Sequence, residues 1–360
     1  MNLDLDETQS LLRETVRGFL EDEVRFDRIR ELEAEQGWDA GLWKSLCEQG
    51  WLGIAFDSAL AGEGGSAVDL GLLVEDFARR AVMVPILEVA VAGRALQGSG
   101  ALAEELLPGI LAGDVVPVPA ILEQTDRFDV IDAELEEDGT LTGEKIFVDY
   151  GQHATHHVVA ARRAGETGLY LLDTSGQGVR TEPLLSIGRT PVCVAHYDAV
   201  PTRFVAGADG LADMIRLGRV LAAIQCVGSM QQSLDATVAY AGVREQFGKP
   251  IGSFQAVKHH LANMLIRVSS ARLLCYDALS ALDSGMADDV RIAAAKASAS
   301  RAAPEVLMLG HQIHGGNGVI EENDLYFFTL RGKERSLAWG SVEECLDIMA
   351  AGVGEGLDFL

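Results

Sequence analysis

The spacing of apolar residues predicts that the first part of the chain is helical. Apolar side chains recur there at intervals of three and four residues, as at Leu12, Val16, Phe19 and Leu20, which places them on one face of a helix. Similar patterning resumes between Asp69 and Arg80, after a glycine-rich loop. We therefore expect residues 1–113 to form an α-helical domain.

The middle of the chain has a different pattern. From about Asp114, apolar residues stand in short runs, such as the one that contains Val158 and Val159, and turn signals such as Asp138-Gly139 separate these runs. Short apolar runs between turns are typical of antiparallel strands. We expect an all-β domain over residues 114–207.

The last part of the chain is helical again. The stretch from Ala293 to Ala303 is rich in alanine, which has the highest helix propensity. A parallel α/β fold would alternate strands with helices, whereas here helices, strands and helices follow one another in blocks, so we reject a Rossmann-type fold. The fold class is therefore mainly α with a β domain, and residues 208–360 form the C-terminal α-helical domain.

The net charge of the chain and the shortness of its apolar stretches argue against nucleic acid and membranes as partners. The 360 residues contain 29 basic and 54 acidic side chains, and 29 − 54 gives a net charge of −25. Such a chain is a poor partner for nucleic acid or for an anionic membrane surface. The most apolar stretch, Ala81–Gly93, contains Pro85 and Glu88 and is too short to span a bilayer. We expect no contact with nucleic acid or membrane.

The cysteines and the start of the chain suggest a cytoplasmic location. The five cysteines are scattered and form no CxxC pair, so neither a disulfide framework nor a zinc site is indicated. The first residues are acidic and lack the basic region of a signal peptide.

One segment contains residues that are suited to binding a ligand: Arg244-Glu-Gln-Phe-Gly-Lys-Pro-Ile-Gly-Ser-Phe-Gln255. We expect it to close one helix at Gly248 and to open the next near Ser253. Arg244 offers a fork of donors that suits a phosphate, and Gln255 would lie in the first turn of a helix, where free backbone N–H groups favour an anion. The alternative is an ordinary helix–helix corner with a capping serine and a solvated arginine.

A second segment is His311-Gln-Ile-His-Gly-Gly-Asn-Gly318. Its glycines allow positive φ and close approach of a ligand to the backbone, and the preceding helix should end at Gly315. The alternative is a simple helix C-cap. His311 and His314 indicate a metal only weakly, because no Cys, Asp or Glu partner has ligand spacing, and we expect no metal.

Together, the two segments resemble the acyl-CoA dehydrogenase family of flavoproteins. The family pattern is R-x-x-F-G, then a Gln eleven residues after the Arg, and later Q-x-x-G-G. The matching residues here are Arg244, Phe247, Gly248, Gln255, Gln312, Gly315 and Gly316. The resemblance extends over nearly the whole chain, including Leu5–Leu12 and the β-domain motif Gly143–Val148.

This resemblance implies the fold and the cofactor. The implied fold has an N-terminal helical domain, a middle antiparallel β-barrel-like domain and a C-terminal four-helix bundle. In the family, the matching residues bind the adenosine and pyrophosphate half of an FAD whose isoalloxazine ring lies in the neighbouring subunit. The implied cofactor-binding residues are Arg244, Phe247, Gln255, Gln312, Gly315 and Gly316.

The sequence departs from the family at the catalytic base. In the family, a Glu removes the α-proton while flavin N5 takes the β-hydride, and that Glu stands before Gly-Thr or Gly-Ser. Here the segment is Ser336-Leu-Ala-Trp-Gly-Ser341, so the base position holds Trp339 or Gly340. Some members carry the base earlier, at a position that corresponds to about Gly218. None of these side chains can abstract a proton, and we expect no catalytic residue in this chain.

The flavin-ring side also departs from the family. The β-domain motif continues as Phe147-Val-Asp-Tyr150, which puts Asp149 where the family has a hydroxyl near flavin N5. A carboxylate beside a ring that becomes anionic on reduction is unfavourable. The upstream stretch Ile121–Asp129 lacks the proline and glycines of the family motif.

These features favour the non-catalytic subunit of a heteromeric acyl-CoA dehydrogenase. The resemblance implies α,β-desaturation of an acyl-CoA thioester, a catalytic partner subunit in an α2β2 assembly, and an electron-transfer flavoprotein as the acceptor. The heteromeric relatives include enzymes that act on steroid side-chain thioesters, which suggests a bulky substrate. The alternatives are a self-sufficient homotetramer with a relocated base and a member of the family turned to another use, including a non-enzymatic assembly partner.

Overall fold

The computed structural model describes residues 5–125 and 127–356, with side chains as far as Gly352. Position 126, inside the stretch Ile121–Asp129, and residues 1–4 and 357–360 lie outside the described residues. The chain forms two compact units. The helical unit contains residues up to 29, 71–82 and from 219 onward, and the mixed unit contains residues 30–70 and 83–218. The domain limits 1–113, 114–207 and 208–360 stay predictions.

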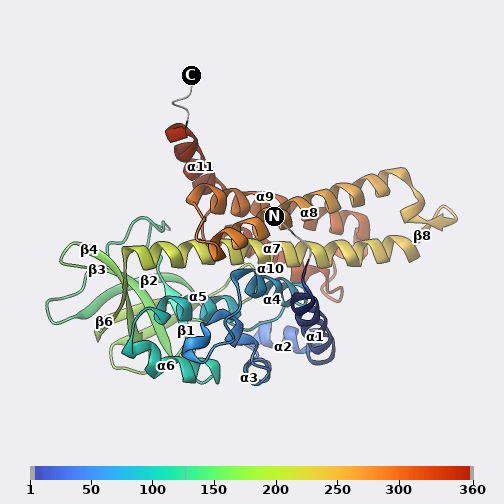
Figure 1. Ribbon diagram of the computed structural model, residues 1–360. Coiled ribbons are helices and arrows are strands. Elements are labelled where there is room, and N and C mark those ends of the chain that lie inside the picture. Colours follow the sequence, from blue (N-terminus) through green and yellow to red (C-terminus); the bar gives the residue numbers. More distant parts are fainter. Residues whose placement is uncertain (1–4, 126, 357–360) are drawn as a thin grey trace. The chain divides into compact units, whose positions relative to one another are not determined.

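Helices flank a strand region along the chain (Figure 1). The helices are α1 (Glu7–Glu23), α2 (Phe26–Glu35), α3 (Ala40–Glu48), η1 (Trp51–Ala55), η2 (Ser58–Leu60), α4 (Ala67–Arg79), α5 (Ile86–Gln97), α6 (Ala101–Leu111), α7 (Ala208–Val243), η3 (Ile251–Ser253), α8 (Gln255–Asp283), α9 (Asp289–His314), η4 (Gly315–Gly318), α10 (Leu325–Leu337) and α11 (Val342–Gly356). The strands are β1 (Pro117–Ala120), β2 (Thr140–Asp149), β3 (His156–Arg163), β4 (Glu166–Asp173), β5 (Val179–Leu184), β6 (Val192–Pro201), β7 (Arg203–Gly207), β8 (Glu245–Gln246) and β9 (Lys249–Pro250). The predicted fold class, mainly α with a β domain, is confirmed.

The mixed unit holds two sheets. One has the order β1-β3-β4-β7 and the other the order β2-β6-β5. The predicted antiparallel pairing is right for all pairs of these sheets except one, because β1 runs parallel to β3, with Pro117 opposite His156. A parallel pair needs a long crossover, and here the chain passes through β2 before it returns as β3.

Helix α5 is the buried helix of the mixed unit. Almost all of its residues are buried, including Glu88, and it packs against β1. A helix that is mostly apolar and mostly buried belongs in a protein core, and its twelve residues are too few for a bilayer. This helix contains residues 86–93 of the apolar stretch Ala81–Gly93. Among the described residues, we found no helix with the length and apolar character needed to cross a membrane.

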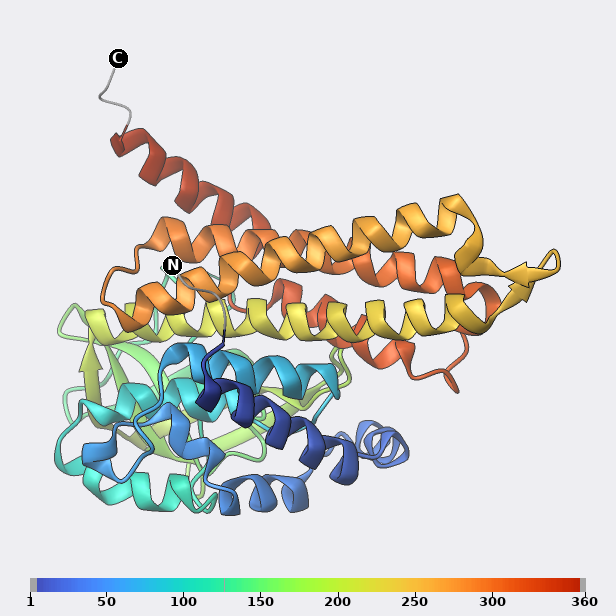
Figure 2. The same cartoon turned by 45° about the vertical axis from the view of Figure 1, so that its right-hand side comes forward.

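The helical unit is built around the alanine-rich helix α9. It packs against α8, α10 and α11, and Figure 2 shows α7, α8 and α9 running side by side. Close packing of α7 on α9 depends on Gly310, because a Cβ atom there would lie 2.7 Å from the hydroxyl oxygen of Ser233. Small residues therefore let the long helices approach one another and form the predicted C-terminal bundle.

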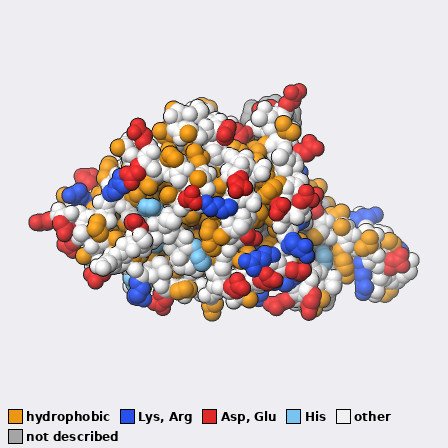
Figure 3. Space-filling view, turned by 90° about the horizontal axis from the view of Figure 1, so that it is seen from below, with side chains coloured by type: hydrophobic (Ala, Val, Ile, Leu, Met, Phe, Trp, Pro, Cys, Tyr) orange, Lys and Arg blue, Asp and Glu red, His pale blue; other side chains and the backbone are white. Residues whose placement is uncertain are grey.

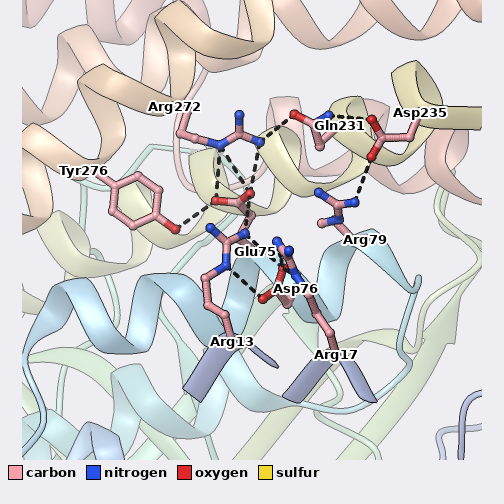
Figure 4. Close-up of polar contacts among 9 residues, drawn as sticks. All are labelled: Arg13, Arg17, Glu75, Asp76, Arg79, Gln231, Asp235, Arg272 and Tyr276. Carbon is pink, nitrogen blue, oxygen red and sulfur yellow. Dashed lines mark hydrogen bonds and ion pairs between the residues drawn. The ribbon is translucent and has the colours of Figure 1, made fainter. Parts of the chain in front are cut away.

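Acidic side chains are spread over the face in Figure 3, with apolar side chains between them. Some carboxylates, however, are buried. Glu75 and Asp76 of α4 are among the least exposed residues of the helical unit. Arg272 of α8 lies 3.0 Å from Glu75, and Arg13 of α1 lies 3.3 Å from Glu75 and 3.1 Å from Asp76 (Figure 4).

The ionic network around Glu75 joins four helices of the helical unit (Figure 4). The Tyr276 hydroxyl donates to Glu75 over 2.8 Å, and Arg272 donates to the Gln231 side chain over 2.8 Å. Burial alone would raise the pKa of Glu75, but the charges of Arg272 and Arg13 outweigh it and hold this pKa below its ordinary value. Glu75 is therefore a buried carboxylate that stays ionised.

Candidate functional site

The segment from Arg244 begins with a short hairpin. Helix α7 ends at Val243, earlier than the predicted end at Gly248, because residues 245–250 pair as β8 and β9. Phe247 and Gly248 form the turn with φ of 54° and 79°. Positive φ at both central residues is the geometry of a type I′ hairpin turn, for which glycine is favoured at the second place.

The tip of this hairpin presents an exposed aromatic ring. Phe247 is 93% exposed, and its ring meets that of Phe254 edge-on at 6.1 Å. The Nζ atom of Lys249 lies 4.5 Å from the Phe254 ring centre. These contacts fix the hairpin against the start of α8, and the side chain of Arg244 stays exposed beside them.

Helix α8 begins at Gln255 with uncapped backbone donors. The predicted start near Ser253 is therefore confirmed to within two residues, and the N-cap residue is Phe254, which has no side-chain cap, so the capping serine of the alternative interpretation is not found at this helix. The side chain of Gln255 is exposed, and its Nε2 atom lies 3.2 Å from Nε2 of His259. Between residues 244 and 260 the chain carries three basic residues and one acidic residue, a local charge of +2 in a chain of −25. Free N–H groups and local positive charge both favour an anion.

The second segment leaves its backbone open to solvent. Helix α9 ends at His314, and Gly315 is its C-cap as predicted, with φ 59° and ψ −137°. A Cβ atom added at Gly315 or Gly316 would meet nothing within 4 Å, and Gln312 is exposed one turn earlier. The conformation of Gly315 is one that a side chain strongly disfavours.

The structure brings the two segments to the same end of the helical bundle. The rings of Tyr240 and His314 stack with their centres 4.3 Å apart. Tyr240 precedes Arg244 by one helical turn, and His314 directly precedes Gly315. This end therefore combines an exposed cation, exposed amides, uncapped helix donors and open glycine backbone.

The two histidines of the second segment have structural partners. His311 contacts the Gly318 carbonyl oxygen at 2.6 Å and the Thr329 hydroxyl at 2.7 Å. Burial lowers the pKa of His314, so its ring stacks on Tyr240 in the neutral form. Within the described part of the chain, no group of three His, Cys, Asp or Glu residues is arranged to hold a metal ion.

The position expected for a catalytic base lies in the turn between α10 and α11, and hydrogen bonds fix this turn. Trp339 is buried and has φ 61°, an uncommon conformation for a bulky residue. The Nε atom of Arg219 donates to the Trp339 carbonyl oxygen over 3.2 Å, and the Arg219 guanidinium also pairs with Glu344. The carboxylate of Glu344 is thus paired with a buried arginine.

Two residues at this turn were missed by the sequence reasoning. Ser341 and Glu344 stand in a Ser-x-x-Glu pattern, which is a capping-box signal, and the Ser341 hydroxyl accepts from the Glu344 N–H at 3.1 Å.

Lys296 of α9 was also missed. It is fully buried, and it donates to the carbonyl oxygen of Arg335 over 2.8 Å and so caps the end of α10. Burial lowers the pKa of Lys296.

An ion pair holds the segment of the mixed unit that the family resemblance assigns to the flavin ring. Lys145 of β2 is fully buried and pairs with Glu123 at 2.5 Å, and Glu123 also accepts from the Asp132 N–H at 2.9 Å. A bulge between Lys145 and Val148 leaves Phe147 half-exposed with φ 51°. Asp149 is the last residue of β2, opposite Val192.

Comparisons with known proteins identify the family. Two family models match: acyl-CoA dehydrogenase, N-terminal domain, over residues 6–114, and acyl-CoA dehydrogenase, C-terminal domain, over residues 206–354. Acyl-CoA dehydrogenase IpdE2 of Mycolicibacterium smegmatis is 31% identical over 340 residues, which cover 92% of this chain and 95% of the relative.

Solved structures give the same result. The Tcur3481–Tcur3483 steroid ACAD variant has a TM-score of 0.92 at 29% identity and covers 97% of this chain and 98% of its own. The ChsE4–ChsE5 complex from Mycobacterium tuberculosis has a TM-score of 0.91 at 26% identity and covers 99% of both chains. The chain therefore belongs to the acyl-CoA dehydrogenase family.

Proposed function

We propose that this chain is the non-catalytic subunit of a heteromeric, FAD-dependent acyl-CoA dehydrogenase. In this proposal, it holds the adenosine and pyrophosphate half of an FAD whose ring belongs to a partner subunit. The observation that carries the proposal is the stack of Tyr240 on His314, which brings the starts of the two segments together: Arg244 follows Tyr240 by one helical turn, and Gly315 directly follows His314.

The residues at this end suit a dinucleotide tail. Arg244 would pair with a phosphate, the uncapped N–H groups at Gln255 would receive an anion, and Gln312 would supply an amide donor and acceptor. The open backbone at Gly315 and Gly316 leaves space that a side chain would fill. Phe247 would lie against the flat part of the nucleotide. When bound, FAD supplies the hydride acceptor for desaturation of an acyl-CoA.

The residues at the expected base positions support the assignment to a non-catalytic subunit. Trp339 and Gly340 cannot remove a proton, and the nearby Glu344 is paired with Arg219. In the mixed unit, Asp149 at the end of β2 adds a carboxylate where the family has a hydroxyl. We infer that the partner subunit supplies both the base and the ring pocket.

The similar proteins support a heteromer and a bulky substrate. One similar structure is described as a steroid ACAD and another as a complex of two differently named chains. We therefore propose an α2β2 assembly that desaturates an acyl-CoA thioester, with a steroid side-chain thioester as the first candidate. An electron-transfer flavoprotein is the electron acceptor that the family implies, and a cytoplasmic location stays a prediction.

The neighbouring reading frame provides the first test. We expect it to encode a second family member with Glu at the position that Trp339 fills here. The two chains should co-purify as a yellow complex that desaturates acyl-CoA. If this chain expressed alone were yellow and active, a self-sufficient dehydrogenase with a relocated base would replace our proposal.

Arg244→Ala in the co-expressed complex tests the cofactor site. We expect flavin content to fall at least tenfold, because the loss of a charge-assisted contact to phosphate removes about 1.5–3 kcal/mol of binding free energy. Arg180→Ala, which removes an exposed charge from β5, is the matched control and should keep its flavin. Unchanged flavin content in Arg244→Ala would favour a purely structural subunit.

A further inference from the structure

The loop Gly315–Gly318, which follows helix α9, is open at its start and packed at its end. We call these four residues the glycine loop. A Cβ atom on either of its first two residues would meet nothing within 4 Å. A Cβ atom at Gly318 would lie 2.8 Å from the Cβ atom of His314 and 3.1 Å from the carbonyl oxygen of His311. The end of the loop is therefore folded back against the last turn of α9.

The glycine loop needs anchors if it is to present a fixed surface to a ligand. Three of its four residues are glycines, and glycine loses more conformational freedom on ordering than any other residue. Freedom that a loop keeps before binding is lost on binding, which weakens the affinity. The contacts that hold this loop therefore bear on how tightly the proposed nucleotide site can bind.

Tyr240 of α7 holds the start of the loop through His314. The two rings stack with 4.3 Å between their centres and an angle of 12° between their planes. The Tyr240 hydroxyl also donates to the His314 carbonyl oxygen over 3.4 Å, and this carbonyl group is bonded to the backbone nitrogen of Gly315. Tyr240 thus contacts both the side chain and the backbone of the residue that precedes the loop.

The packing of α7 on α9 sets the position of this stack. Gly310 lies one turn before His314, and a Cβ atom there would come within 2.7 Å of the hydroxyl oxygen of Ser233 and 3.2 Å of that of Thr237. Tyr240 is one turn beyond Thr237 on α7. The two helices approach closely at Gly310, and the next turn of each helix supplies one ring of the stack.

His311 holds the far end of the loop. Its Nδ1 atom lies 2.6 Å from the Gly318 carbonyl oxygen, which can only accept a hydrogen bond. In the neutral ring, Nδ1 therefore carries the proton, and Nε2 accepts from the hydroxyl of Thr329 in α10 over 2.7 Å. The loop is thus held from α7 at its start and from α10 at its end.

We infer that Tyr240, His311 and His314 are positioning residues of the proposed nucleotide site. They fix the glycine loop before a nucleotide binds, and they fix it beside α7, where Arg244 follows Tyr240 by one turn. This inference rests on the proposed function. The three side chains act through the backbone of the loop, whereas Arg244 would act on the nucleotide itself.

His314 contributes to the stack through the flat shape of its ring. Both ring nitrogens are buried, and neither has a hydrogen-bond partner among the residues that the structure describes. Burial also lowers the pKa of this ring, which is therefore neutral. A phenylalanine ring can stack on Tyr240 in the same way without a nitrogen atom. We therefore expect phenylalanine, but not alanine, to replace His314.

The test compares His314→Ala with His314→Phe in the complex with the partner subunit, stripped of flavin and titrated with FAD. We expect the Kd for FAD to rise about tenfold in His314→Ala, because one more residue must then be ordered on binding. In His314→Phe, which keeps the stack, the Kd should stay within about threefold of the wild-type value. Tyr240→Ala and His311→Ala should each weaken binding as His314→Ala does.

Val306→Ala is the matched control for lost stability. Val306 is a fully buried residue of α9, two turns before His314, so this variant lowers the melting temperature through the same helix. Its Kd for FAD should equal that of the wild type. If Val306→Ala weakens FAD binding as much as His314→Ala does, lost stability explains the effect, and the inference fails.

The other outcomes separate this inference from the proposed function. If the alanine variants at His314 and Tyr240 bind FAD as the wild type does while Arg244→Ala loses flavin, the positioning role is wrong and the proposed function stands. If Arg244→Ala also keeps its flavin, the proposed function fails with it. If His314→Phe binds FAD as weakly as His314→Ala, the ring nitrogens matter instead of the stack, and the assigned role is overturned.

Discussion

Arg219 and Trp339 are joined by a hydrogen bond that fixes the turn between α10 and α11. The Nε atom of Arg219 donates to the Trp339 carbonyl oxygen over 3.2 Å, although the two residues are 120 positions apart in the chain. The same guanidinium pairs with Glu344. The turn at the expected base position is thus held by a buried cation, and the strained φ of Trp339 persists because its surroundings hold it.

We expect Arg219→Met to destabilise the chain by about 1–3 kcal/mol. The substitution leaves Glu344 without its cation and removes a donor from the Trp339 carbonyl, but Glu344 is partly exposed and water will compensate for some of the loss. Urea unfolding followed by tryptophan fluorescence measures the change.

The control for Arg219→Met is Arg216→Met on the same helix. Arg216 pairs at 2.9 Å with Asp213, which is largely exposed, and such surface pairs contribute about 0–1 kcal/mol. An equal loss of stability in both variants would contradict the role that we assign to Arg219.

Local pattern was enough to predict the helices and the end of α9. Val16 and Leu20 are buried on one side of α1, as their spacing predicts, and Gly315 ends α9 because its conformation requires a glycine. The parallel pairing of β1 with β3 was not predictable, because a four-residue strand carries no information about its neighbour. The hairpin after Val243 was missed because its strands have two residues each.

The polar interior could not be predicted from local pattern. Glu75 and Arg272 are 197 positions apart, and nothing near either residue in the sequence indicates that they meet. Lys296 stands in an alanine-rich stretch where a solvated lysine is the ordinary expectation, yet it is fully buried and caps α10. The Arg244 and Gly315 segments could be proposed from the sequence because helix termini, glycines and charges have local signatures.

Glu75→Gln should weaken the helical unit. A neutral amide would leave Arg13 and Arg272 without their shared carboxylate, and removing one partner of a buried ionic network costs about 3–5 kcal/mol. We expect a loss near the lower end of this range, because both arginines are partly exposed. The change is measured by urea unfolding at neutral pH.

Tyr276→Phe is the companion variant for Glu75→Gln. It removes one hydrogen bond to Glu75 but no charge, so we expect a loss of only about 1 kcal/mol. If Glu75→Gln were no more destabilising than Tyr276→Phe, the ionic character of the network would be irrelevant to stability.

His157 should make the stability of the mixed unit depend on pH. Burial lowers its pKa to about 4 from an ordinary value near 6.5, and its ring contacts the Tyr197 hydroxyl at 2.8 Å and the Gly151 carbonyl oxygen at 3.0 Å. Between about pH 6.5 and pH 4, His157 is therefore protonated in the unfolded chain and neutral in the folded chain. The free energy of unfolding is highest above about pH 6.5 and decreases as the pH approaches 4. The titration of His157 lowers it by about 3 kcal/mol.

The pH effect of His157 is isolated by comparison with His157→Gln. Both proteins are unfolded with urea at pH 7 and at pH 5, and the loss of stability between the two pH values should be smaller in the variant. Burial also lowers the pKa of His153 and His156, so the variant will keep part of the dependence. An unchanged difference between the two pH values would show that His157 is not the titrating group.

Gly316→Leu should remove flavin from the complex without unfolding this chain. A Cβ atom at Gly316 meets nothing within 4 Å, so the leucine fits the chain itself but fills the space where a nucleotide would approach the backbone. Gly98→Leu is the control, since Gly98 is equally open and lies at the end of α5 in the mixed unit, whereas both site segments belong to the helical unit. We expect both variants to melt within a few degrees of the wild type, and flavin absorbance to fall at least tenfold only in Gly316→Leu. Full flavin retention by Gly316→Leu would mean that the open glycine backbone serves only to end α9.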